Sequence, residues 1–327
     1  MILRILGALL AISTLSAEDK SRFELLKAES LAVYERCLQV ADQFYVLGED
    51  EDCKEITQAI LDSPLTNEAI KQRILATNRR FFLFQYPSDG YQVKGHISFV
   101  PDATTKPLLL FLRGGNRIFG LMHPATDYSC FKDYTVLSPA FRGGVSEGED
   151  QFGGEEVNDV QNLMDYLPTL ARKLQLELSP KSVYALGGSR GGMEMFLALA
   201  RSPSLQNIIS KAVSLSGLLD IRECMRYRPD MRQMFIRDFG LIPDQNEEEW
   251  IAMRNPILAA AQIRHDLPIL ILQGTNDLRT GIQEGYHMVE TLKSHGHPVE
   301  YIEIPDGTHC LTNYPSRMDM IADWLER

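Results

Sequence analysis

The sequence predicts an α/β fold, with a mostly parallel sheet of eight strands, helices on both faces and a helical N-terminal segment. Three observations support this prediction. From residue 108 onward, short runs of consecutive apolar residues recur, which is typical of parallel strands covered on both faces. Helical patterns of three-to-four spacing separate these runs. Before them, β-rich runs at 81–86 and 93–100 flank the turn-forming residues 87–90, which favours an antiparallel pair.

The chain begins with a short apolar stretch. Residues 5–15 carry no charge and follow a single arginine, Arg4. Small residues come next, and together these features predict a signal peptide over residues 1–17. The stretch is too short to cross a bilayer, so no integral membrane segment is expected after its removal. We therefore expect an exported protein, periplasmic or secreted; the alternative is a buried first helix in a cytoplasmic protein.

Residues 18–79 are polar and predict a helical segment. Apolar residues between positions 25 and 40 recur at roughly helical spacing, and Thr66 opens a second, shorter helical pattern. From residue 80 to 327 the pattern changes to alternating strands and helices. The eight strands are expected at 81–86, 93–100, 108–112, 134–138, 182–187, 211–216, 268–273 and 299–304. Segment 217–262 has no clear strand, and we predict an insertion that packs over the edge of the sheet.

Composition and charge narrow the class of partner. The chain has 327 residues and a formal net charge of −11. Nucleic acids and anionic membrane surfaces bind clusters of basic residues, so this charge argues against both and leaves a small peptide or ester as the natural partner. No metal-ligand spacing is present among the five cysteines. The sequence leaves open whether Cys37 and Cys53 form a disulfide in an exported protein or stay free thiols.

Four glycines surround Ser189 in the stretch YALGGSRGGMEM, residues 184–195. The stretch follows one predicted strand and precedes an amphipathic helix, which is the context of the G-x-S-x-G nucleophile elbow. A strand that turns into a helix within one residue strains the serine backbone, and side chains at Gly187 and Gly191 would clash in that turn. We expect the serine hydroxyl at the carboxyl end of the sheet, where ligands of such folds bind. A plain glycine-rich turn is the alternative.

A nucleophilic serine needs a base, and the base needs an orienting acid. Asp277 and His309 each follow a predicted strand, and with Ser189 they stand in the chain order serine, acid, histidine. Asp220, which follows the strand at 211–216, competes with Asp277 for the role of the acid. The other histidines lie within predicted elements or away from this edge: His96, His123, His265, His287, His295 and His297.

An acyl-transfer site also needs two N–H donors for the developing oxyanion. One is expected from Arg190, the residue after the serine. The other is expected from the loop that follows the strand at 108–112, at Gly115 or Asn116. For that loop, an ordinary strand-ending turn is the alternative.

Residues 80–327 resemble the catalytic domain of the prolyl oligopeptidase (S9) family of serine peptidases, which has an α/β-hydrolase fold. Four stretches carry the resemblance. GGSRGG is similar to the family's serine motif, and FRGGVSEGEDQFGGEEVNDV is similar to its R-G loop and the acidic start of the helix that follows. LQGTNDLRT is similar to its acid loop, and DGTHC is similar to its histidine loop. The resemblance implies that Ser189, Asp277 and His309 form the catalytic triad of a serine hydrolase.

Departures from the family pattern bear on the substrate. Family peptidases usually carry a large β-propeller before this domain, which admits only short peptides and anchors the peptide amino terminus. Here about 60 helical residues, 18–79, stand before it. The family often uses a tyrosine as an oxyanion donor, where this chain has Gly-Gly-Asn at 114–116. An aromatic residue commonly follows the serine, and here it is Arg190.

The sequence therefore predicts a serine hydrolase that works through an acyl-enzyme and hydrolyses peptide bonds, as the family does. A carboxylesterase acting on small acyl esters is the alternative with the same chemistry. A catalytically silent binding module is a third reading, which the presence of all three triad residues disfavours. No cofactor and no metal are implied. We expect small substrates, with short acyl esters turned over faster than peptide amides.

Overall fold

The computed structural model describes residues 17–101, 107–125, 131, 133–178 and 180–327, with side chains described from residue 25 onward. The expected signal peptide at 1–17 lies outside these residues, apart from the backbone of Ala17. Within them, no helix combines the length and the apolar character needed to cross a bilayer.

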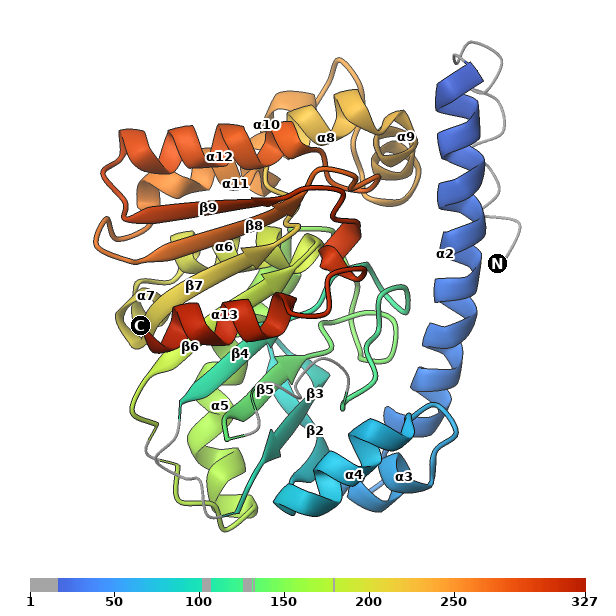
Figure 1. The fold of residues 1–327 in the computed structure, drawn as a ribbon, viewed down its shortest axis with the longest axis vertical. Helices are drawn as coiled ribbons and strands as arrows, with labels where there is room; N and C mark the ends of the chain where they lie inside the picture. The colour runs from blue at the N-terminus through green and yellow to red at the C-terminus, as the bar shows by residue number, and fades with distance from the viewer. Residues whose placement is uncertain (1–16, 102–106, 126–130, 132, 179) are drawn as a thin grey trace.

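One sheet organises the described part of the chain (Figure 1). Its nine strands are β1 (Cys53–Glu55), β2 (Arg80–Ser88), β3 (Tyr91–Phe99), β4 (Leu108–Leu112), β5 (Thr135–Pro139), β6 (Val183–Gly188), β7 (Ile209–Leu215), β8 (Ile269–Gly274) and β9 (Val299–Ile304). They lie in the order β1-β2-β3-β5-β4-β6-β7-β8-β9. The pairs β1–β2, β2–β3 and β3–β5 are antiparallel, and every pair from β5 to β9 is parallel. The predicted mostly parallel α/β sheet is confirmed.

The described sheet has nine strands rather than the expected eight because the sequence analysis missed β1. This strand is three residues long and mostly exposed, so it has no apolar periodicity that would reveal it. The first hairpin is also longer than expected. Asp89 and Gly90 both have positive φ, 48° and 89°, and form a two-residue turn that continues the pairing of β2 and β3 up to Ser88 and Tyr91.

Helices cover both faces of the sheet. They are α2 (Ala17–Phe44), α3 (Thr57–Asp62), α4 (Glu68–Thr77), α5 (Asn158–Lys173), α6 (Arg190–Arg201), α7 (Pro203–Ile208), α8 (Ile221–Tyr227), α9 (Pro229–Asp238), α10 (Glu247–Arg254), α11 (Pro256–Ala259), α12 (Ile282–Ser294) and α13 (Arg317–Glu326), with short 3₁₀ turns at Glu155–Val157, Ala260–Gln262 and His309–Leu311. Alternate residues of β4 separate the two cores. Leu108 and Leu110 belong to the core that includes residues of α5, α6 and α12, and Leu109 belongs to the core that includes residues of α13.

The N-terminal helices α2, α3 and α4 form a third apolar cluster against β2. Helix α4 begins after Asn67, whose side chain accepts a hydrogen bond from the backbone N–H of Ile70. The sequence had suggested Thr66 as the opening residue. The Thr66 hydroxyl instead lies 2.9 Å from Nε2 of the buried His123, so it is not used to cap the helix. Cys37 and Cys53 are free thiols.

Segment 217–262 folds as the helices α8 to α11, at the top of Figure 1. Several of its apolar residues belong to the core rather than to an open surface: Phe235 is fully buried and its ring packs on Phe152 and Trp250. Four of its arginines are paired with carboxylates of the same segment, in the pairs Arg222–Glu248, Arg226–Glu223, Arg228–Asp230 and Arg232–Glu247. The segment is therefore a packed cover on the sheet.

Candidate active site

Ser189 occupies a sharp turn between β6 and α6. Its φ of 56° and ψ of −127° lie outside the regions that side-chain-bearing residues prefer. The turn is fixed from the β7 side, because the Ser189 N–H donates to Leu215 O at 3.0 Å and its carbonyl accepts from Leu218 N at 3.0 Å. Although the serine stands at the N-cap of α6, its side chain makes no capping hydrogen bond. The hydroxyl is thus not used to stabilise the helix.

The glycines around Ser189 are required by close backbone contacts. A Cβ on Gly191 would lie 1.9 Å from the carbonyl oxygen of Leu112 in β4, and one on Gly187 would lie 2.3 Å from the carbonyl oxygen of Gly191. Across the site, a Cβ on Gly114 would lie 2.7 Å from Cβ of Ser189. Gly188 differs, because its Cβ would meet only the Cys310 sulfur, at an ordinary 3.8 Å. Strand β4, the turn and helix α6 therefore meet at backbone distance.

The structure brings His309 and Asp277 together. Nδ1 of His309 lies 2.9 Å and 3.0 Å from the two carboxylate oxygens of Asp277. The carboxylate also accepts hydrogen bonds from Arg279 N at 2.8 Å and from the Thr280 hydroxyl at 2.9 Å. The Asp277 side chain is fully buried, whereas 21% of the His309 side chain is exposed. With Nδ1 engaged by the carboxylate, Nε2 is the ring nitrogen left for chemistry.

These contacts shift the pKa of both groups. Burial by itself would raise the pKa of Asp277, but His309 and the donors from Thr280 and Arg279 lower it below the usual value. Burial would lower the pKa of His309, and the Cys310 sulfur and the Asp277 carboxylate raise it from 6.5 to about 10.

Asp220, the competing acid, lies in a different environment. Its carboxylate is 2.9 Å from Nδ1 of His287 on α12, and it caps α8 by accepting from Arg222 N at 3.0 Å. The remaining histidines also lie elsewhere. His96 and His123 pack with Tyr45 and Phe44, and His265, His295 and His297 lie near one another. In the described part of the chain, no group of three or more histidine, cysteine, aspartate or glutamate side chains is arranged so that it could hold a metal ion.

The loop after β4 approaches the serine through its backbone. Gly115 has a φ of 70° and packs against the Phe119 carbonyl. Two arginines hold the peptide groups of this loop. Arg113 donates to Gly114 O at 2.9 Å, and Arg190 donates to Gly115 O at 3.0 Å. Because a trans peptide is planar, fixing each carbonyl also fixes the direction of the N–H on its other side. The Asn116 side chain lies instead 3.5 Å from the Met234 sulfur of α9.

The side chain of Arg190 has a role that the sequence analysis missed. It is 5% exposed and its guanidinium contacts three buried carboxylates, Asp150 at 2.7 Å, Glu156 at 2.5 Å and Glu194 at 2.8 Å. Burial and the other two carboxylates raise the pKa of Glu194 to about 8, against the opposing effect of Arg190. The acidic run at 149–156 was the available signal. Arg190 therefore ties the start of α6 to the loop that precedes α5.

The insertion holds the loop that carries Asp277, which the sequence analysis also missed. The Tyr227 hydroxyl donates to Asp277 O at 3.1 Å, and Arg228 donates to Arg279 O at 3.3 Å. Both residues lie where α8 meets α9. Their separation from Asp277 along the chain leaves no local pattern that would predict these contacts.

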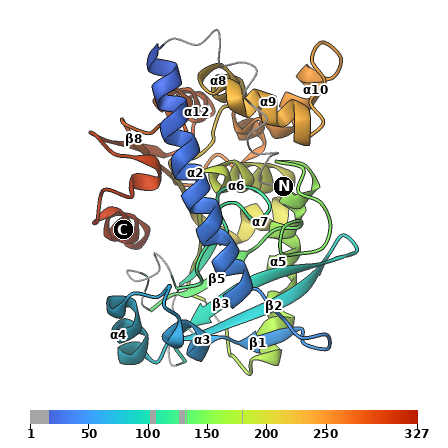
Figure 2. The same cartoon turned by 90° about the vertical axis from the view of Figure 1, so that its right-hand side faces the viewer.

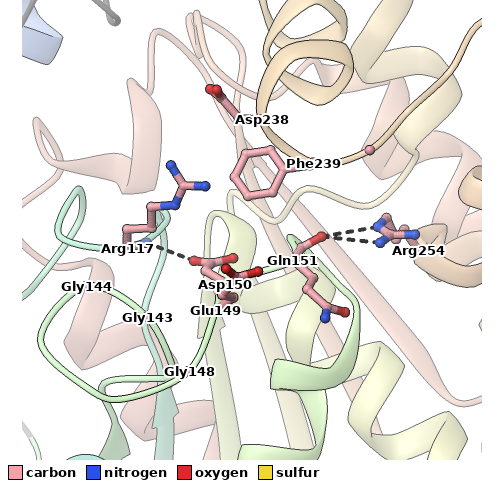
Figure 3. A pocket seen from close by; sticks show the side chains of 11 residues that line it. Arg117, Gly143, Gly144, Gly148, Glu149, Asp150, Gln151, Asp238, Phe239 and Arg254 are labelled. Carbon is pink, nitrogen blue, oxygen red and sulfur yellow. Dashed lines mark hydrogen bonds between the residues drawn. The ribbon is translucent and has the colours of Figure 1, made fainter. Parts of the chain in front are cut away.

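An open cavity of about 580 Å³ is lined in part by Asp150, one of the carboxylates that contact Arg190 (Figure 3). Arg117, the loop 143–151, residues 238–240 and Arg254 line it. The Arg117 N–H donates to Asp150 at 2.8 Å, so the cavity shares a wall with the Arg190 cluster. Ser189, Asp277 and His309 do not line it. The cavity therefore neighbours the candidate site without containing the groups that would react.

Comparison with known proteins gives related sequences over most of the chain. The prolyl oligopeptidase family profile matches residues 126–327. An uncharacterized peptidase of Bacillus subtilis, YtmA, is 28% identical over 253 residues, which cover 76% of this chain and 93% of that protein. The acylamino-acid-releasing enzyme of Rattus norvegicus is 25% identical over 247 residues, 69% of this chain but only 32% of the enzyme. The chain thus spans nearly all of YtmA and about a third of the rat enzyme.

Solved structures give the same fold. The acylaminoacyl peptidase of Pyrococcus horikoshii superposes with a TM-score of 0.62 at 17% identity, over 75% of this chain and 41% of that one. An esterase from Rhizomucor miehei superposes with a TM-score of 0.62 at 17% identity, over 83% of this chain and 94% of that one. At these identities the likeness establishes the α/β-hydrolase fold alone.

The close contact at Gly191 makes a specific prediction about stability. We expect Gly191→Ala to lower the free energy of unfolding by about 3 kcal/mol or more, because β4 or α6 must move to admit the methyl group. The matched control is Gly188→Ala in the same turn, which should cost about 1 kcal/mol or less because its methyl group has ordinary space. Urea unfolding followed by circular dichroism measures both. Equal losses for the two variants would contradict the account of the turn.

Proposed function

Because the chain belongs to the prolyl oligopeptidase family and is a serine hydrolase, we propose that Ser189 is its nucleophile, His309 its general base and Asp277 the acid that orients the base. The observation that carries this proposal is the pairing of His309 Nδ1 with the buried Asp277 carboxylate at 2.9 Å. The strained backbone of Ser189, whose side chain does not cap α6, supports the assignment of the nucleophile.

In this proposal, Ser189 Oγ attacks the carbonyl carbon of the substrate while Nε2 of His309 accepts the hydroxyl proton. The carbonyl π electrons move to oxygen and form a tetrahedral oxyanion. The backbone N–H groups of Arg190 and Gly115 stabilise that charge. His309 then gives its proton to the leaving group, and the acyl-enzyme forms. Water, activated by the same histidine, attacks the ester, and the acid product leaves as Ser189 regains its proton.

We further propose small acyl substrates, either short peptides or esters. Proteins similar to this chain are named peptidases and acylamino-acid-releasing enzymes, which supports a peptide substrate. An ester substrate is the alternative, because ester hydrolysis uses the same catalytic groups. Both reactions pass through the same acyl-enzyme. Export of the protein remains our proposal from the N-terminal sequence.

Replacing the nucleophile gives the first test. Ser189→Ala should abolish labelling by a fluorophosphonate and lower turnover by about 10⁴ or more, because no other hydroxyl group would be activated. The matched control is Ser202→Ala, which removes another N-cap serine, one that caps α7 by accepting from Leu205 N. That variant should label normally. Labelling that persists in Ser189→Ala would show that the nucleophile lies elsewhere.

The acid is tested by its effect on pH dependence. The reaction needs neutral His309, and the Asp277 carboxylate raises the pKa of that imidazole, so kcat/KM should rise with pH through a midpoint above 6.5. Asp277→Asn removes the negative charge, so the midpoint should move to lower pH, and kcat should fall by about 10³ to 10⁴. As the control, Asp220→Asn should leave the midpoint in place and cost less than about tenfold. Reversed effects of the two variants would assign the role to Asp220.

A substrate panel tests the size and bond preference. Short-chain p-nitrophenyl esters should be hydrolysed faster than the corresponding peptide p-nitroanilides, because an amide leaving group must be protonated as the bond breaks. A folded protein of the size of casein should be cleaved far more slowly than either. Steady-state kcat/KM values measure the ranking. Cleavage of such a folded protein at a rate that rivals the esters would contradict the proposed substrate class.

A further inference from the structure

Helix α2 lies on the side of the molecule where the parallel strands end. Figure 1 shows it alongside the sheet, and Figure 2 shows it crossing the front of the molecule from the level of α8 to that of α3. Its contacts agree with this view. The Tyr45 side chain that follows α2 donates to Met122 O at 3.1 Å, in the segment after β4, and the helix also contacts Arg279 in the loop after β8. It therefore spans loops on both sides of β6, the strand that carries Ser189.

Arg279 joins α2 to the loop that holds Asp277. Its Nη2 donates to Ser30 Oγ at 3.3 Å and lies 3.6 Å from the Glu29 carboxylate. Only 18% of the arginine side chain is exposed. The backbone of the same residue supports the Asp277 carboxylate, because Arg279 N donates a hydrogen bond to Asp277 Oδ1. The side chain thus contacts the helix, while the backbone supports the candidate catalytic carboxylate.

The Arg279 guanidinium also reaches the opposite side of the site. It lies 5.8 Å from the centre of the Phe119 ring, in the loop after β4. The Phe119 carbonyl packs directly on Gly115, one of the proposed oxyanion donors. Arg279 and Phe119 therefore connect the acid loop with the oxyanion loop, and α2 lies against this connection.

The two halves of α2 are held differently. The C-terminal half is anchored in the third apolar cluster, where Val40 and Phe44 are each 1% exposed, and Cys37 contacts Leu121 O. In the stretch 25–36, Leu26 is the buried residue, and Leu25, Leu31 and Val33 are exposed. This half contributes little to the core. Its contacts with Arg279 hold it against the loops of the site.

We propose that residues 25–36 of α2 form a size filter at the candidate active site, and that Arg279 is the positioning residue that latches the filter in place. The inference rests on the proposed function. Acyl groups that fit beneath the helix reach Ser189 with the latch closed. A long peptide needs the helix to move, so it loses the free energy of the latch contacts as it binds. The latch should therefore act on the KM of long substrates and leave the chemistry at Ser189 unchanged.

Two p-nitrophenyl esters that share a leaving group test this proposal, one of a short acyl group and one of a blocked octapeptide. Opening the latch by Arg279→Ala, or by the double change Glu29→Ala and Ser30→Ala, should raise the ratio of kcat/KM for the long ester to that for the short one by about fivefold, through a lower KM. Arg279→Lys keeps a positive charge near Glu29 and should restore part of the discrimination. Glu35→Ala, which removes an exposed carboxylate on the same helix, is the control and should leave the ratio unchanged.

The rate of fluorophosphonate labelling separates the filter from the catalytic groups. It should be unchanged in the double variant Glu29→Ala and Ser30→Ala and in Glu35→Ala, because none of these side chains belongs to the proposed catalytic groups. An unchanged ratio in both latch variants would overturn the filter. Slower labelling in the double variant Glu29→Ala and Ser30→Ala, matched by slower hydrolysis of the short ester, would overturn it too and assign the contact between α2 and Arg279 to support of Asp277. Failure of the unmodified protein to label would instead overturn the proposed function, and the filter with it.

Discussion

The contact between Gly191 and the carbonyl of Leu112 is the constraint on which the rest of the site depends. It brings the first turn of α6 against the end of β4 with no space for a side chain. The strand that carries Ser189 must therefore reverse within one residue, which holds the serine at an unfavourable φ and ψ. The same closeness places Gly114 against the serine. One backbone approach thus fixes both the candidate nucleophile and the loop proposed to bind the oxyanion.

Loops around this turn are organised by buried arginines. Arg113 donates hydrogen bonds to the backbone carbonyls of Gly114, Arg117, Phe119 and Ala140. Arg190 donates to a carbonyl of the same loop and also contacts three carboxylates. A buried guanidinium is stable only when its donors are satisfied, so it dictates where several chain segments must lie. This explains why a charged residue can follow the serine here. Its side chain points into the protein and leaves the backbone N–H for the site.

The sequence revealed those features that depend on local pattern. Gly187, Gly191 and the strand–helix context marked the turn at Ser189, and the apolar runs marked the parallel strands. Features set by distant contacts were missed or misplaced. Strand β1 is defined by its pairing with β2, and Asn67 caps α4 while the hydroxyl of Thr66 contacts His123. Likewise the direction of the Asn116 side chain depends on Met234, more than a hundred residues away. None of these follows from spacing along the chain.

The loop that carries Asp277 shows how the surroundings of the site can differ while its chemistry stays the same. From one side the insertion holds it, through Tyr227 and Arg228, and from the other side α2 contacts it through Arg279. Neither element supplies a group that reacts in the proposed mechanism. In the filter proposed above, α2 limits which acyl groups approach Ser189. Under these proposals, substrate choice depends on a helix that lies outside the sheet, whereas acyl-enzyme formation depends on the turn and loops at the strand ends.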